Sequence, residues 1–157
     1  MKNILITGGV GFIGSRFVKH IYNATDYNII VVDKLTYAAD SYRIPENIKE
    51  DDTRFKMVIG DINDLSSDSL PDISYIVNFA AESHVDNSIS DGRPFVRSNI
   101  EGVFNLLEVA KAQNKDIFEK FVQVSTDEVY GDMEERRGAL EADESFSLKP
   151  SSYYSAS

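Results

Sequence analysis

The sequence predicts an α/β fold built on a doubly wound parallel sheet. Short apolar runs of strand length alternate with polar or helix-patterned segments along the chain, as expected of repeated βαβ units. A glycine-rich turn follows the first apolar run, and an aspartate closes the second. In sheets of this kind, ligands bind beyond the carboxyl ends of the strands. The polar residues that follow the apolar runs are therefore the candidates for function.

Five apolar runs are expected to form the strands. They are Asn3–Thr7, Asn28–Val32, Phe55–Ile59, Ile73–Phe79 and Phe121–Val124. Their length and apolar character are typical of strands buried on both faces. The expected strand order is 3-2-1-4-5, that of a Rossmann-type half with its extension.

Apolar residues recur at helical spacing from Gly11 to about Ala24 and from Phe95 to Gln113. A short helix is expected near Asn63 to Leu70, and a polar loop is expected between Asp33 and about Thr53. On the longest helix, one side is expected to carry Phe95, Val96, Ile100, Val103, Phe104, Leu107 and Ala110.

Composition excludes several functions. The 157 residues suffice for one domain with a real core. A net charge of −10 argues against a nucleic-acid surface, which needs a basic stripe. The chain has no cysteine, so it offers no disulfide, no thiolate nucleophile and no sulfur ligand, and no metal site is expected. No apolar run reaches the roughly 18 residues of a membrane span. A soluble cytoplasmic protein is expected.

The turn after the first strand predicts a dinucleotide site. It reads Gly8-Gly9-Val10-Gly11-Phe12-Ile13-Gly14 and fits two glycine frames, one starting at Gly8 and one at Gly9. Glycines here allow a tight turn and let the backbone approach a pyrophosphate, while the helix N-terminus attracts the phosphates. The alternative is a plain glycine turn, which the strand-turn-helix context makes the weaker interpretation.

Two aspartates at strand ends fit the same site. Asp33 follows Gly14 by about twenty residues, the spacing at which a carboxylate accepts the ribose hydroxyls and repels a 2′-phosphate, which favours NAD over NADP. The cation of Lys34 works against that preference. Asp61 precedes Ile62, and the two can bracket an adenine ring. Asp61 can also serve as a helix N-cap, and one carboxylate can do both.

Five motifs occur in one order and resemble the extended short-chain dehydrogenase/reductases. They are the glycine turn, Asp33-Lys34-Leu35-Thr36-Tyr37-Ala38, Asp61-Ile62, Ala80-Ala81-Glu82-Ser83-His84-Val85-Asp86, and Ser125-Thr126-Asp127-Glu128-Val129-Tyr130-Gly131 with Tyr154-Ser155-Ala156-Ser157. More narrowly, the Thr-Asp-Glu triplet resembles the dTDP-glucose 4,6-dehydratase family of NAD-dependent lyases, which act in deoxysugar biosynthesis. The resemblance covers the whole chain.

The resemblance implies a role for each matching residue. NAD would be bound by Gly8, Gly11, Phe12, Ile13, Gly14, Asp33, Lys34, Leu35, Thr36, Asp61, Ile62, Ala80, Ala81, Ser83, Asn99, Ser125 and Tyr154. Substrate would be bound by His84 and Thr126. The catalytic residues would be Thr126, Asp127, Glu128 and Tyr154, with Tyr154 taking the proton of the 4-hydroxyl, Asp127 acting as the acid and Glu128 as the base.

Each role has a plainer alternative. Tyr154 can be a packed tyrosine, Asp127 and Glu128 can be solvated carboxylates at a strand end, and His84 can be a loop histidine bonded to backbone. A sugar-nucleotide epimerase or decarboxylase shares most of the pattern, although the adjacent Asp-Glu pair argues against an epimerase. A dinucleotide-binding module without catalysis is the third alternative.

The family continues where this chain ends. A lysine is expected four residues after Tyr154, and the chain ends at Ser157. The chain is therefore expected to be a partial NAD-binding Rossmann domain spanning residues 1–157, truncated before the later strands, without the C-terminal substrate-binding part, and inactive alone. The full-length form is expected to be a homodimer acting on a nucleotide sugar, with dTDP-glucose as the substrate that the resemblance favours.

Overall fold

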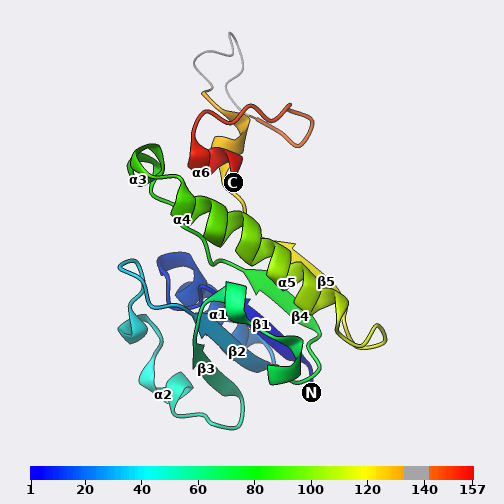
Figure 1. The fold of residues 1–157 in the computed structure, drawn as a ribbon. Helices are drawn as coiled ribbons and strands as arrows, with labels where there is room; N and C mark the ends of the chain where they lie inside the picture. Colours follow the sequence, from blue (N-terminus) through cyan, green and yellow to red (C-terminus); the bar gives the residue numbers. More distant parts are fainter. Residues whose placement is uncertain (133–141) are drawn as a thin grey trace.

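A computed structural model describes residues 1–132 and 142–157 and shows a five-stranded parallel sheet in the order β3-β2-β1-β4-β5 (Figure 1). The strands are β1 (Asn3–Thr7), β2 (Asn28–Asp33), β3 (Phe55–Ile59), β4 (Tyr75–Asn78) and β5 (Lys120–Gln123). The predicted fold class and strand order are confirmed. The fourth strand is shorter than expected at both ends, and the fifth begins and ends one residue earlier.

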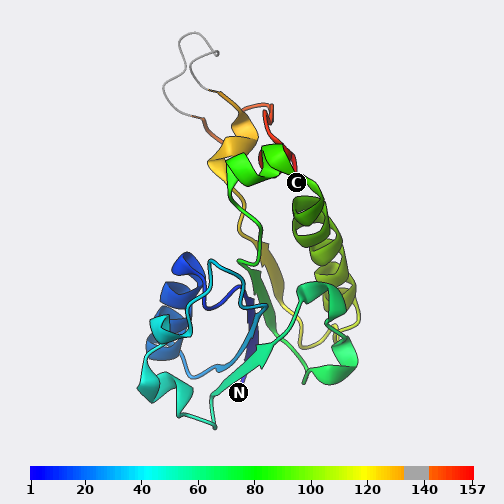
Figure 2. The same ribbon diagram turned by 60° about the vertical axis from the view of Figure 1, so that its left-hand side comes forward.

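Alternate residues of the central strand supply two separate cores. Ile4 and Ile6 of β1 belong to the core under α1 (Phe12–Ala24) and α2 (Glu46–Lys49), whereas Leu5 belongs to the core under α5 (Gly102–Lys111). Figure 2 shows these helices on opposite sides of the sheet. Because side chains alternate along a strand, a sheet buried on both faces needs a continuous apolar run.

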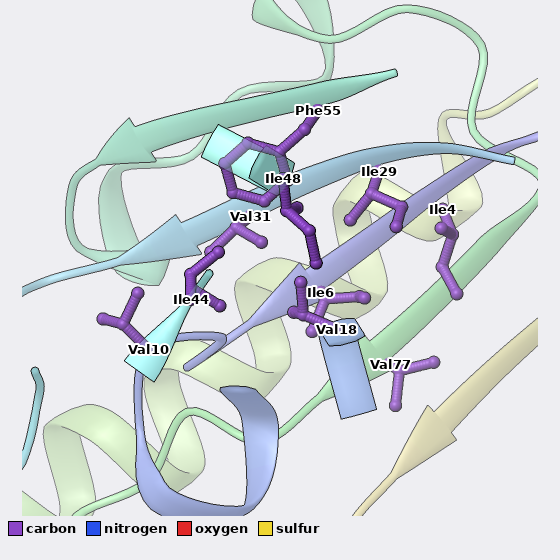
Figure 3. Packing of buried hydrophobic residues seen from close by; sticks show 10 residues of the cluster. All are labelled: Ile4, Ile6, Val10, Val18, Ile29, Val31, Ile44, Ile48, Phe55 and Val77. Atoms are coloured by element: carbon purple, nitrogen blue, oxygen red, sulfur yellow. The ribbon is translucent and has the colours of Figure 1, made fainter. Parts of the chain in front are cut away.

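The first core fills the space between the sheet and the chain from Val10 to Ile48 (Figure 3). Ile6, Val18 and Val31 are fully buried, and burying each such side chain stabilises the fold by about 1.5–3 kcal/mol. Ile44 and Ile48 join them from the segment predicted as a polar loop. That segment instead forms η1 (Ser41–Arg43) and α2, because these two isoleucines pull it onto the sheet.

The long helix is interrupted by a wider turn. Its parts are α4 (Arg93–Phe95), the π-helical segment η4 (Val96–Glu101) and α5, which follow one another as a single rod (Figure 1). Only part of the predicted apolar side is buried. Phe95 and Ala110 are buried as expected, whereas Val96, Ile100, Phe104 and Leu107 are 45–65% exposed. Leu106 and Val109, which were not predicted, face the core instead. A π turn contains an extra residue, so Phe95 before the turn and the buried residues of α5 after it do not keep the angular spacing of one continuous α-helix.

Two further elements differ from expectation. The helix predicted near residues 63–70 is replaced by two single turns, η2 (Ile62–Asp64) and η3 (Ser67–Ser69), capped by the side chains of Asp61 and Ser66. Polar residues that bond to nearby backbone compete with helix continuation. A helix that was not predicted, α3 (Val85–Ser90), follows β4.

The C-terminal residues gather beyond the sheet. The turn η5 (Asp127–Tyr130) follows β5, and α6 (Tyr153–Ala156) contacts both η5 and α3 (Figures 1 and 2). Within residues 1–132 and 142–157, no helix combines the length and the apolar character needed to cross a membrane.

Close packing against the glycine turn predicts a glycine requirement at the start of α1. A Cβ on Gly14 would lie 2.3 Å from the carbonyl oxygen of Gly8. Gly14→Ala should therefore lower the free energy of unfolding by about 1–3 kcal/mol, the usual cost of overpacking. Denaturant unfolding measures this. Gly60→Ala is the control, because its Cβ would meet no atom within 4 Å. Equal losses in both variants would contradict the packing argument.

Candidate active site

Two adjoining cavities lie beyond the carboxyl ends of the strands. The first, about 90 Å³, is bordered by the glycine turn and the ends of β2 and β3. The second, about 160 Å³, is bordered by the end of β5 and by α6. Ala80 and Ala81, just after β4, line both cavities. The two cavities therefore form one groove that crosses the sheet end, where ligands of doubly wound sheets bind.

The structure distinguishes the two glycine frames. Gly8 has a φ of +65°, and a Cβ there would lie 2.6 Å from the backbone nitrogen of Ala80. Gly8 and Gly11 line the first cavity, whereas a Cβ on Gly9 would meet the side chain of Val31 beneath the turn. The frame of Gly8, Gly11 and Gly14 is the one that forms the groove wall and the close packing behind it.

The N-terminus of α1 borders this groove through Gly11, whereas Phe12, Ile13 and Gly14 line neither cavity. Gly11 is the N-cap, and the first turn contains no acidic residue. The first N–H groups of a helix have no partner within it, which favours an anion there. Phe12 and Ile13 contribute to this turn through their backbone, since their side chains are 72% and 61% exposed.

Asp33 connects the two loops on either side of the first cavity. Its carboxylate is buried and accepts hydrogen bonds from the backbone nitrogens of Val10, at 3.1 Å, and Leu35, at 2.9 Å. Leu35 has a φ of 56°, a conformation uncommon for a leucine. Asp33, Lys34 and Thr36 all line the cavity, while Leu35 lies outside its lining.

Asp61 serves as a cap and also lies in the groove, so both predicted roles are compatible. One carboxylate oxygen accepts the backbone and side-chain N–H groups of Asn63, and the other lies 2.8 Å from the ammonium of Lys34. Burial raises the pKa of the Asp61 carboxyl, but Lys34 and Asn63 outweigh that effect and lower its pKa to about 2. Asp61 and Ile62 both line the first cavity.

Asn99 holds the β4 loop against the C-terminal helix. Its side chain accepts the Glu82 N–H and donates to the Glu82 carbonyl, both at 2.9 Å, and it also donates to the Ser157 hydroxyl at 2.9 Å. Asn99 projects from the π-helical segment and lines the second cavity. It contacts backbone and serine, as expected of a residue that positions loops.

The second cavity brings Thr126 and Tyr154 together, with Ser125 beside them. The Thr126 side chain caps η5, and its hydroxyl donates to the Glu128 carboxylate at 3.1 Å. Tyr154 is half-buried, with its ring edge-on to Phe95. Asp127 is exposed, and neither Asp127 nor Glu128 lines the cavity in this arrangement.

Two predicted residues lie apart from the groove lining. Ser83 and His84 are exposed, and His84 is the N-cap residue of α3 without a side-chain capping bond. They follow the Ala80-Ala81 segment but line neither cavity.

A chain of polar side chains was not predicted; it is buried at Thr7 and Asn78 and reaches the second cavity at Gln123. The Thr7 hydroxyl donates to the Asn78 side-chain oxygen, which also accepts the Ala80 N–H at 3.1 Å. The Asn78 amide donates to Gln123 at 2.8 Å. These residues end β1, β4 and β5, and the only signal in the sequence is one polar residue at the end of each apolar run.

Comparisons with known proteins identify the family. The family model described as GDP-mannose 4,6 dehydratase matches residues 5–157. The dTDP-glucose 4,6-dehydratase of Haemophilus influenzae is 43% identical over 100% of this chain and 48% of its own length. The chain thus spans about half the length of the curated relatives it matches.

Solved structures give the same result. A double mutant of DesIV, a dTDP-glucose 4,6-dehydratase from Streptomyces venezuelae with NAD and DAU bound, is 37% identical with a TM-score of 0.84, over 98% of this chain and 47% of that one. A UDP-N-acetylglucosamine 4-epimerase from Methanobrevibacter ruminantium has the same TM-score, 0.84, at 25% identity, over 99% of this chain and 46% of that one. On sequence and structure, this chain belongs to the family of sugar-nucleotide 4,6-dehydratases described by the GDP-mannose 4,6 dehydratase model.

Proposed function

We propose that this chain is the cofactor-binding part of an NAD-dependent dTDP-glucose 4,6-dehydratase. The observation that carries the proposal is the continuity of the groove. One end has a glycine turn and a buried aspartate, and the other has Thr126 and Tyr154, with Ala80 and Ala81 shared between them. A dinucleotide needs such a path from its adenosine end to its reactive ring.

The residues present fit NAD. Gly8 and Gly11 line the groove with bare backbone where a pyrophosphate would approach the start of α1. Asp33 has a buried carboxylate at the position that binds ribose hydroxyls in this type of site. When bound, NAD would supply a carbon that accepts a hydride from the sugar and later returns it.

The side chains of this chain would handle the protons. Tyr154 would take the proton of the 4-hydroxyl as C4 is oxidised to a ketone, and Thr126 would orient that hydroxyl. The ketone makes the C5 proton acidic. Glu128 would remove that proton while Asp127 protonates the departing 6-hydroxyl, so that water leaves across C5 and C6. Hydride return to C6 and a proton returned to C5 would complete the 4-keto-6-deoxy sugar.

The turn η5 carries both carboxylates next to the second cavity, with Thr126 in its lining. Thr126 fixes η5 through its capping bond, and its hydroxyl holds the Glu128 carboxylate at 3.1 Å. Asp127 is exposed and open to a substrate that approaches from outside. The assignment of Asp127 as the acid and Glu128 as the base follows the resemblance of the triplet to the 4,6-dehydratases.

An epimerase is the second candidate, favoured by the similarity of the Methanobrevibacter epimerase fold. Both enzyme types would share oxidation at C4 and the Tyr154 side chain. The adjacent Asp127 and Glu128 argue for the dehydratase, because elimination of water needs a separate acid and base. A dinucleotide module without catalysis would need neither.

The whole protein is proposed to be larger than this chain and dimeric. The relatives are about twice as long, and the second half would complete the sheet and the sugar pocket. Val96, Ile100, Phe104 and Leu107 form an exposed apolar stripe on η4 and α5. A second copy of the full-length protein would cover that stripe. The 157 residues alone would not turn over substrate.

NAD should bind more tightly than NADP, because Asp33 would repel a 2′-phosphate. Calorimetric titration of the purified protein with both cofactors measures the difference. Asp33→Asn should reduce the difference in affinity between NAD and NADP. Asp52→Asn removes an exposed carboxylate elsewhere and should leave that difference unchanged. Equal or tighter binding of NADP by the unmodified protein would refute the role of Asp33.

Glu128→Gln in the full-length enzyme should separate oxidation from elimination. Oxidation at C4 depends on Tyr154 and should continue, while elimination should slow by about 10²–10⁴-fold, the usual contribution of a general base. Reduced cofactor should accumulate after mixing with dTDP-glucose, and stopped-flow absorbance would detect it.

The control for this experiment is Glu50→Gln, at an exposed position, which should leave turnover unchanged. Normal product formation by Glu128→Gln without accumulation of reduced cofactor would remove Glu128 from the base role. Loss of oxidation itself would show that the triplet positions the substrate instead.

A further inference from the structure

The end of β2 carries two adjacent side chains of opposite charge, and both line the first cavity. The buried Asp33 carboxylate is fixed by two backbone N–H groups. The next residue, Lys34, has a side chain that is 52% exposed. A lysine ammonium on a flexible stem is well suited to a phosphate, so Lys34 alone would favour a cofactor with a 2′-phosphate.

The partner of Lys34 is held rigidly on the neighbouring strand end. The backbone N–H of Gly60 donates to the Asp33 carbonyl at 3.0 Å, which keeps the ends of β2 and β3 side by side. Asp61 follows directly, its side chain only 11% exposed and bonded to both N–H groups of Asn63. Lys34 reaches across to this fixed carboxylate at 2.8 Å.

We propose that Asp61 is a second determinant of cofactor choice, because it engages Lys34 in an ion pair and thereby withholds that cation from a 2′-phosphate. Asp33 would repel the phosphate, and Asp61 would remove the attraction that Lys34 would otherwise supply. This inference rests on the proposed function, since it concerns the choice between two cofactors at the same site.

A second cation near the groove does not account for this effect. Arg43 donates through one guanidinium nitrogen to the carbonyls of Val10, at 3.1 Å, and Ala38, at 2.7 Å. These backbone acceptors persist when Asp61 is changed. Arg97 lines a neighbouring cavity with Lys34 and Asp61, so a variant that also lacks Lys34 is needed to assign a difference to Lys34.

The test compares the dissociation constants of NAD and NADP for cofactor-free full-length protein by calorimetry. Asp61→Asn keeps the shape of the side chain and an oxygen that can accept the hydrogen bonds from Asn63, but it removes the negative charge that pairs with Lys34. The affinity ratio should shift toward NADP by about tenfold, the size expected of one charge-assisted hydrogen bond. Effects on the adenine ring are common to both cofactors and cancel in the ratio.

Two variants make the test specific. Asp61→Asn combined with Lys34→Ala removes the pair without changing net charge and should restore the unmodified ratio. Glu46→Gln removes the partner of Lys49, an ion pair on α2, and controls for the loss of one negative charge.

The outcomes separate this proposal from the proposed function. The proposal is overturned if the NAD-to-NADP affinity ratio is unchanged in Asp61→Asn, or if Glu46→Gln shifts it equally. Either result leaves the proposed NAD binding intact. The double variant tests the proposal even if Asp61→Asn does not fold. If its affinity for NADP relative to NAD is lower than that of the unmodified protein, Lys34 must already bind the 2′-phosphate in the unmodified protein, and the proposal is overturned. Failure of the unmodified protein to bind either cofactor would instead refute the proposed function, and this inference with it.

Discussion

The close approach of the glycine turn to the end of β4 is the constraint on which the groove depends. Gly8 lies so near the Ala80 backbone that no side chain fits between them. That contact places Ala80 where it can border both cavities. A larger residue at Gly8 would push the turn away from β4 and separate the two ends of the groove.

Buried polar groups fix the strand ends on either side of that contact. Asn78 connects Thr7 on β1 with Gln123 on β5 and also holds the Ala80 N–H. Buried polar groups are costly without partners, so this chain of bonds requires the three strand ends to keep one register. Asp33 does the same for the loops after β1 and β2. The walls of the groove are thus joined by hydrogen bonds among their own residues.

Local patterns in the sequence predicted the sheet and the glycine turn well, because apolar runs and glycine spacing depend on neighbours along the chain. The face of the long helix was not predictable in this way, since the π turn at Val96–Glu101 changes its phase. The ion pair between Lys34 and Asp61 joins residues on different strands, and only the strand order brings them together. The contact of Glu128 with Thr126 is local, but it depends on the single turn η5, which was not predicted.

The π turn allows one continuous helical rod to pack against two different parts of the fold. Phe95, before it, packs against Tyr154, and Leu106, after it, packs against the sheet. In a regular α-helix, the angle between the Phe95 and Leu106 side chains about the helix axis would be set by their spacing in the sequence alone. The extra residue changes that angle by a fixed amount, so that one continuous rod makes both contacts. The π turn thus lets the same helix pack against the C-terminal helix before the turn and against the sheet after it.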